Sequence, residues 1–202
     1  MKAFLAKTEY IDYSNEAIQG KMKELFTDDM NEVEKVKVAY EFVRDKIPHS
    51  FDCNATIITA KASEVLKHKT GICHAKSNLL AALLRGQNIP VGFCFEHITL
   101  AADDSLGYCV HAYNAVYVKG RWIKLDARGN NEKVNAKFSL EESILAYPPR
   151  EQYDEYFFPG IYANPQMETM KMLEKAECLQ DIMDNIPEFV VETPDIIGSM
   201  EV

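Results

Sequence analysis

Three residues of this chain could form a thiol-based catalytic site: Cys73, His111 and Asp126. Cys73 falls in the first turn of a helix predicted over residues 72–85, where unpaired backbone N–H groups and the helix dipole favour a thiolate. A histidine beside that sulfur could act as general base and acid, and a carboxylate behind the ring would fix its tautomer and stabilise its cation. Singly, the three are more simply interpreted as a buried thiol, a hydrogen-bonded histidine and a turn carboxylate. The chemistry therefore depends on whether the fold brings them together.

A predicted hairpin around Lys119-Gly120 would bring two of the three residues, His111 and Asp126, close together. In the register that this turn favours, Tyr113 faces Asp126, and His111 lies on the same face of the sheet as Asp126, about 7–8 Å away as a diagonal neighbour. A one-residue slip in the pairing would move Asp126 to the opposite face. The sequence thus predicts that one hairpin brings imidazole and carboxylate together, while the thiol comes from a separate helix.

The elements that must hold these residues follow an α+β order, with helices early in the chain and strands in the middle. Apolar spacing and turn residues predict helices packed on a central antiparallel sheet. The helices are predicted over residues 31–46, 62–68, 72–85 and 166–183, and the strands over residues 91–100, 107–118 and 121–125.

Three predicted loops, residues 47–60, 101–105 and 147–162, are expected to shape the specificity of such a site. The aromatic, proline-broken segment 147–162 fits either a wall of a substrate groove or packing over the sheet. The acidic segment after Pro187 fits an extended or loosely held conformation.

Composition limits the class of protein. The chain has 202 residues, 47% of them hydrophobic, which is typical of a single globular domain over residues 1–202. The net charge of −9 disfavours nucleic-acid binding, and no run approaches the roughly 18 apolar residues of a membrane span. Five cysteines, an odd number without clustered spacing, fit free thiols in the reducing cytoplasm. The expected partner is therefore a substrate, with neither nucleic acid nor membrane, and the oligomeric state stays open.

The remaining histidines and cysteines have structural interpretations. Cys94 and Cys109 are predicted to pack in the core, with redox control of Cys73 as the alternative. His97 on a strand favours a cross-strand polar contact over a ligand role, and His68 favours the carbonyl end of its helix. No cofactor or metal is expected, because Cys-x-x-Cys and His-Glu-x-x-His are absent, although scattered ligands could still form a zinc site.

Several motifs, taken together, resemble the transglutaminase-like superfamily over about residues 36–129. They are Gly71-Ile72-Cys73 at a helix start, Leu83-Leu84-Arg85 followed by Ile89-Pro90-Val91, the strand His111-Ala112-Tyr113-Asn114-Ala115-Val116-Tyr117, and Gly120-Arg121-Trp122-Ile123-Lys124-Leu125-Asp126. The resemblance implies a papain-like fold with a core over residues 36–129 and a C-terminal elaboration over residues 130–202. It also implies that Cys73 is the nucleophile, His111 the general base and acid, and Asp126 the residue that orients His111. His74 and Tyr113 depart from residues common in the family, and neither departure removes a catalytic group.

The resemblance further implies a cysteine-dependent enzyme that transfers acyl groups at amide bonds through a thioester. A small chain without an evident calcium loop favours a peptidase or amidase over a crosslinking enzyme, with a peptide, protein or small amide as substrate. The alternative is a catalytically silent module that binds a peptide or partner in the same groove. His49 and Asn54, in the loop before the nucleophile, are the candidates for a second oxyanion donor beside the Cys73 backbone N–H.

Overall fold

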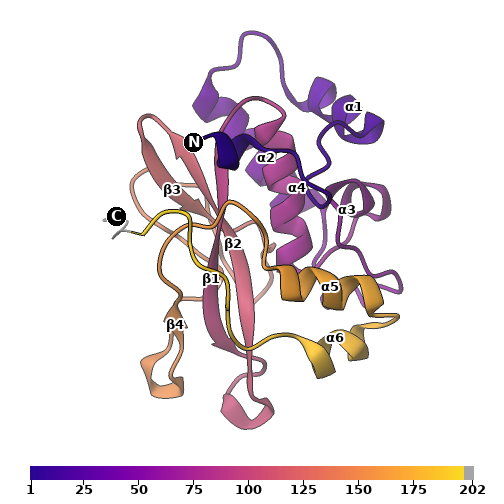
Figure 1. Ribbon diagram of the computed structural model, residues 1–202, viewed down its shortest axis with the longest axis vertical. Coiled ribbons are helices and arrows are strands. Elements are labelled where there is room, and N and C mark those ends of the chain that lie inside the picture. Colours follow the sequence, from indigo (N-terminus) through magenta and orange to yellow (C-terminus); the bar gives the residue numbers. More distant parts are fainter. Residues whose placement is uncertain (198–202) are drawn as a thin grey trace.

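A four-stranded antiparallel sheet with helices packed against it forms the framework of the protein. The computed structural model describes residues 1–197 and is shown in Figure 1. The strands have the spatial order β3-β2-β1-β4, and the α+β class predicted from the sequence is confirmed. The helices are α1 Glu16–Leu25, α2 Glu32–Lys46, α3 Ala62–His68, α4 Cys73–Arg85, α5 Met167–Lys175 and α6 Leu179–Asn185. The strands are β1 Val91–Thr99, β2 Tyr108–Val118, β3 Arg121–Leu125 and β4 Tyr156–Phe157.

Helix α4 lies between the sheet and the other N-terminal helices, and every one of its residues is buried. Its leucines belong to the main hydrophobic cluster, together with side chains from α2, β1 and β2. Several of its polar side chains donate hydrogen bonds to backbone carbonyls that are distant in the chain. Asn78 donates to the Ala60 carbonyl at 2.8 Å, and the Arg85 guanidinium donates to the Val91 and Ala163 carbonyls at 2.7 and 2.6 Å. These contacts hold α4, and with it the residue at its N-terminus, in a fixed place.

The β2–β3 hairpin has the predicted register. Val118 pairs with Arg121 and Asn114 pairs with Leu125, which confirms the pairing expected around Lys119-Gly120. Both turn residues have positive φ, 55° for Lys119 and 80° for Gly120, as a tight turn matching the strand twist requires. Asp126 follows β3 directly, so the turn geometry determines where its carboxylate lies.

The C-terminal helical segment differs from the prediction. The single helix predicted over residues 166–183 is wrong, because two helices, α5 and α6, occupy this region. The Asp181 carboxylate accepts hydrogen bonds from the backbone N–H groups of Glu177 and Cys178, at 2.7 and 3.1 Å. It thereby caps a new helix start, and α6 takes a different direction from α5.

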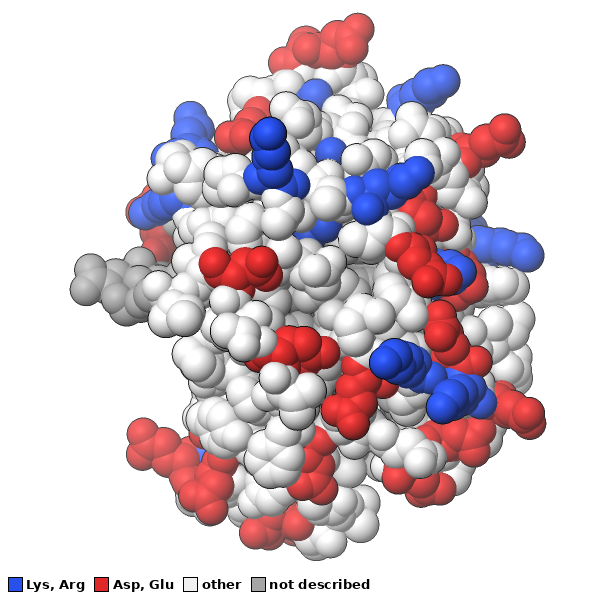
Figure 2. All heavy atoms as spheres, viewed as in Figure 1, with Lys and Arg blue, Asp and Glu red and all other residues white. Residues whose placement is uncertain are grey.

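Residues 186–197 run in an extended path along the sheet (Figure 1). The Pro187 carbonyl accepts a hydrogen bond from the Val110 N–H at 2.9 Å, and Ile196 forms a bridge with Ile161. On the face shown in Figure 2, acidic side chains gather over the lower half of the molecule, whereas the lysines and arginines are more widely spaced. Within residues 1–197, the helices all lack the length and apolar character that a bilayer span needs.

Candidate active site

Cys73 is the first residue of α4, and Ile72 occupies the N-cap position without a capping side chain. The thiol side chain is 8% exposed and borders a cavity. Gly71, two residues earlier, forms a bridge with His49, and an added Cβ there would lie only 3.2 Å from Ala75 and 3.3 Å from Thr59. The absence of a side chain at Gly71 thus lets Ala75 and Thr59 pack close to the backbone just before the helix.

His111 on β2 and Asp126 after β3 form a buried pair. The His111 Nε2–H donates to Asp126 Oδ2 at 2.8 Å. The same Oδ2 accepts from the Ala146 N–H at 3.0 Å, and Oδ1 accepts from the Arg128 N–H at 3.0 Å. These bonds hold the carboxylate rigidly and leave Nδ1 as the ring nitrogen of His111 that can serve the thiol.

The electrostatics favour a thiolate next to an imidazolium. Burial alone would raise the pKa of Cys73, but the charge of His111 and hydrogen bonds from His111 and the Ala112 backbone outweigh it and lower that pKa. Burial alone would lower the pKa of His111, but the charges of Asp126 and Cys73 raise it well above its usual value. The pKa of Asp126 is lowered, because His111 and backbone N–H groups outweigh its burial. A low-pKa thiol of this kind is the form that acts as a nucleophile.

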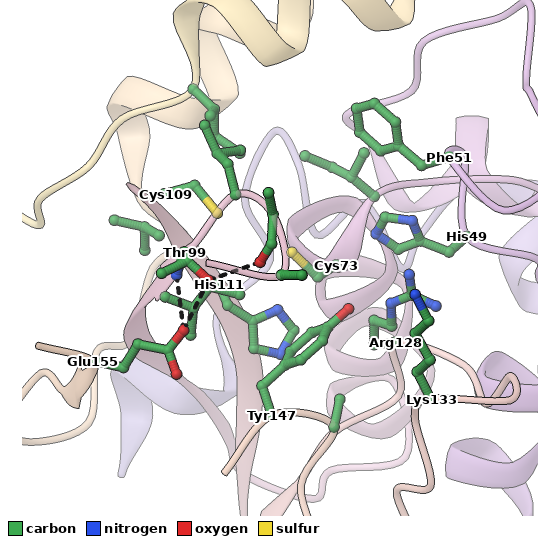
Figure 3. Close-up of a pocket in the computed structure, with 18 of the residues that line it drawn as sticks. His49, Phe51, Cys73, Thr99, Cys109, His111, Arg128, Lys133, Tyr147 and Glu155 are labelled. Atoms are coloured by element: carbon green, nitrogen blue, oxygen red, sulfur yellow. Dashed lines mark hydrogen bonds between the residues drawn. The ribbon is translucent and has the colours of Figure 1, made fainter. Parts of the chain in front are cut away.

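A cavity of about 870 Å³ joins this group to the surface, and mostly apolar atoms line it. In Figure 3, Cys73 and His111 lie in its middle, with Thr99, Cys109 and Glu155 to one side and His49, Arg128 and Lys133 to the other. Such a size is typical of pockets that enclose a small ligand or a peptide segment. The residues that line it are His49, Phe51, Ile72, Cys73, Ile98, Thr99, Leu100, Ala101, Ala102, Cys109, Val110, His111, Arg128, Lys133, Ala146, Tyr147, Pro148, Arg150, Glu155, Ile182, Met183 and Ile186.

The two oxyanion-donor candidates have different positions. Asn54 is exposed, has a φ of 49° in a turn, and is absent from the cavity wall. His49 lines the cavity with Cys73, and its ring stacks on Phe51 with centroids 5.9 Å apart. Burial and the nearby Arg128 keep the pKa of His49 well below its usual value, so the ring is neutral.

Tyr147 is a site residue that the sequence indicated only through its aromatic segment. Its ring meets His111 edge-on with centroids 5.0 Å apart, and Arg128 lies over its other side at 5.9 Å. Tyr147 therefore walls the cavity, one of the two outcomes expected for residues 147–162. The later aromatics Tyr156 and Phe158 instead pack around His97 on the sheet.

Other predicted residues serve the structure. Cys94 is buried in a second apolar cluster, and burial raises the pKa values of both Cys94 and Cys109 to about 12. Cys109 nevertheless lines the cavity. The Nδ1–H of His97 donates to the Glu188 carbonyl at 2.9 Å, so its polar contact is with the C-terminal segment and not with a neighbouring strand. All five cysteines are free, and within residues 1–197 no three His, Cys, Asp or Glu side chains gather as metal ligands would.

The fold and the site define an α+β protein with a helix-borne thiol facing a histidine–aspartate pair on a hairpin. The sequence pattern described as the transglutaminase-like superfamily matches residues 19–127, more than half of the chain, and so includes α1 as well as the predicted core. The chain belongs to the transglutaminase-like superfamily. The expected family resemblance is thereby confirmed.

Two solved structures are similar to this chain at low identity. A proposed cysteine protease from Cytophaga hutchinsonii is 20% identical, with a TM-score of 0.46, over 62% of this chain and 40% of that chain. A TGase is 16% identical, with a TM-score of 0.38, over 66% of this chain and 35% of that chain. This chain thus aligns with less than half of either protein. The search of curated proteins found no match.

Proposed function

We propose that the protein is a cysteine-dependent acyl-transfer enzyme that hydrolyses an amide bond of a peptide, protein or small amide. The observation that carries this proposal is the Cys73–His111–Asp126 arrangement, in which Cys73 and His111 line an open cavity and Asp126 is buried behind them. The Cys73 thiolate attacks the carbonyl carbon, and a C–S bond forms as the carbonyl π electrons move to oxygen. His111 then gives its proton to the departing nitrogen, and the C–N bond breaks to leave a thioester.

In the second half of the reaction, His111 takes a proton from water, and the resulting hydroxide attacks the thioester and releases Cys73 as thiolate. Asp126 keeps the His111 ring in one tautomer and stabilises its cation in both halves. Because Asp126 is held by two backbone N–H groups as well as by the ring, the pair needs no rearrangement during the cycle.

The negative charge on the tetrahedral intermediate needs hydrogen-bond donors. The backbone N–H of Cys73 at the start of α4 is one, and we assign His49 as the other. The neutral His49 ring carries one N–H. The ring lies on the Arg128 side of Cys73, away from Thr99 and Glu155 (Figure 3). Removing such a donor typically lowers the rate by about 100-fold or more. The variants His49→Ala and His49→Gln should therefore differ, because the glutamine retains a donor.

The proposal is tested by mixing the protein with p-nitrophenyl acetate and recording the burst of p-nitrophenolate. We expect a burst equal to the enzyme concentration and an acetyl group on the peptide that contains Cys73. The variant Cys73→Ala should give neither, and Cys109→Ala should give both. No release of p-nitrophenolate by the wild-type protein above that of Cys73→Ala, or acetylation spread over several cysteines, would favour the silent binding module.

Acyl transfer to water is distinguished from acyl transfer to an amine by adding a primary amine to the same reaction. If water is the normal acceptor, methylamine leaves most of the acetyl group as acetate. Quantitative formation of the amide would instead assign the protein to the crosslinking type of reaction.

A further inference from the structure

One side of the cavity is built from apolar residues that take no part in the acid–base chemistry. Ile98 and Leu100 come from the end of β1 and the turn after it, Met183 comes from α6, and Ile186 is the residue that follows α6. The hydrogen bond from the Val110 N–H to the Pro187 carbonyl places the end of α6 beside β2, next to Cys109. Ile98 and Leu100 lie within the matched residues 19–127, whereas Met183 and Ile186 lie outside them, so the C-terminal segment completes a wall that the matched core begins.

The polar residues on this side already form hydrogen bonds with one another. Glu155 Oε1 accepts hydrogen bonds from Arg150 Nη2, the Thr99 N–H and the Thr99 hydroxyl, at 2.6, 3.0 and 3.0 Å. Its Oε2 accepts from the Arg150 N–H and from Nε, both at 2.9 Å. The pKa of Glu155 falls to about 2, since these hydrogen bonds outweigh the effect of its burial. A ligand therefore finds few free donors or acceptors here, and its contacts with this wall are apolar.

The opposite side of the cavity is polar. Arg128 is paired with Asp52 through both terminal nitrogens, and Lys133 is exposed beside it (Figure 3). Cys73 lies between the two sides, so a substrate held over the sulfur presents one part to the apolar wall and another to the polar side. Burial of a methylene against such a wall favours binding by a factor of roughly three to four.

We propose that the acyl part of the substrate is an aliphatic group that lies against Ile98, Leu100, Met183 and Ile186, and that α6 selects it. This inference rests on the proposed function, because it describes the acyl group that Cys73 accepts. The acylation step is the same for any ester or amide: the C–S bond forms and the bond to the leaving group breaks, without a cofactor.

The test measures acylation by p-nitrophenyl esters of increasing chain length, from acetate through butyrate and hexanoate to octanoate. We expect kcat/KM to rise about threefold for each added methylene until the wall is filled. The mono-p-nitrophenyl ester of adipic acid has the length of the hexanoyl group but ends in a carboxylate. It should react at least about tenfold more slowly than the hexanoate, because the wall offers the charge no partner.

Variants in α6 test whether this helix contacts the acyl group. Met183 is half-buried, so Met183→Glu places a charge in the wall and should lower the octanoate-to-acetate ratio by about tenfold or more. Met183→Leu should keep the ratio, and Asn185→Asp, which adds a charge on the exposed side of the same helix, should also keep it. Met183→Ala is the milder second variant, with an expected drop of about threefold, and serves if the glutamate disturbs the fold.

The outcomes of the two proposals are distinguishable. A normal acetate burst at Cys73, combined with equal rates along the ester series or an unchanged ratio in Met183→Glu and Met183→Ala, overturns the aliphatic acyl site and leaves the enzyme proposal standing. If the wild-type protein releases no p-nitrophenolate from the acetate ester through Cys73, both proposals are overturned.

Discussion

The Nε2–H of His74 donates a hydrogen bond to the Val110 carbonyl at 2.8 Å. His74 follows Cys73 in the chain and Val110 precedes His111, so this one bond ties together the two segments that carry the thiol and the imidazole. Burial lowers the pKa of His74 to about 4, which keeps the ring neutral. The Ser77 hydroxyl adds a second connection between α4 and β2, to the Ala112 carbonyl at 3.4 Å. His74, a departure from residues common in the family, is thus a structural connection at the site.

Replacing His74 tests this positioning role. The variant His74→Phe keeps a ring but leaves the buried Val110 carbonyl without its donor, at a cost of about 1–3 kcal/mol in the free energy of unfolding. We expect the rate of Cys73 acylation to fall by about tenfold and the pKa of the thiol to rise, because sulfur and imidazole are no longer held together. The pH dependence of acylation measures the second effect, and an unchanged thiol pKa in His74→Phe would reduce His74 to a purely structural residue. His74→Gln retains a donor, so its acylation rate and thiol pKa should lie between those of the wild-type protein and those of His74→Phe.

Asp126 should respond differently to two substitutions. Asp126→Asn keeps one acceptor oxygen, but its NH2 group then faces a donor, either the Arg128 N–H or the His111 ring, so we expect a loss of acylation rate of about tenfold or more. Asp126→Ala leaves the Ala146 and Arg128 N–H groups unpaired as well, with a loss of about 100-fold or more and a destabilisation of about 2–4 kcal/mol. Burst rates and urea unfolding measure the two quantities separately. Equal rates in both variants would show that the His111–Asp126 bond does not contribute to catalysis.

Glu96 gives a prediction about stability and pH. It is fully buried on β1, opposite His111 on β2, and neither of its carboxylate oxygens has a hydrogen-bond partner within the described residues. Burial raises the pKa of Glu96 to about 8. The charges of Asp126 and Glu155 also raise this pKa, whereas those of His111 and Lys124 lower it.

Because this carboxyl holds its proton more tightly in the folded than in the unfolded chain, its ionisation destabilises the protein as the pH rises from about 4.3 to 8. The variant Glu96→Gln should therefore raise the free energy of unfolding at pH 8 by about 2 kcal/mol or more and change it little below pH 5. Urea unfolding at the two pH values measures the difference. A stability change that is the same at both would mean that Glu96 is ionised throughout.

The local part of this architecture could be predicted from the sequence. Helix α3 has the bounds that its apolar spacing and the following Lys69-Thr70-Gly71 break indicated, and the β2–β3 pairing follows from Lys119-Gly120. Both depend on interactions between residues close in the chain. The hairpin register is also what places Asp126 beside His111, so that pair of the candidate site was within reach of sequence reasoning.

Contacts between distant segments could not be predicted in this way. Lys76 is buried on α4 and donates to the Ile47 and Arg128 carbonyls, and burial lowers its pKa to about 7. A hydrophobic pattern assigns such a lysine to the surface, because nothing in the pattern shows which carbonyls will meet it. The break between α5 and α6 depends on the capping role of Asp181, and only the folded chain reveals that α6 walls the cavity.

The central claim is that Cys73 is a thiolate at neutral pH because His111 is beside it, and alkylation by iodoacetamide, resolved by cysteine, tests it most directly. Between about pH 5 and 9, we expect Cys73 to react fastest, with a rate that stays high below the ordinary thiol pKa of about 8.5. The variant His111→Ala should remove this low-pH reactivity, so that the Cys73 rate falls about tenfold per pH unit below that value. A wild-type Cys73 rate that falls about tenfold per pH unit below about pH 8.5, as the rate of an ordinary thiol does, would contradict the account.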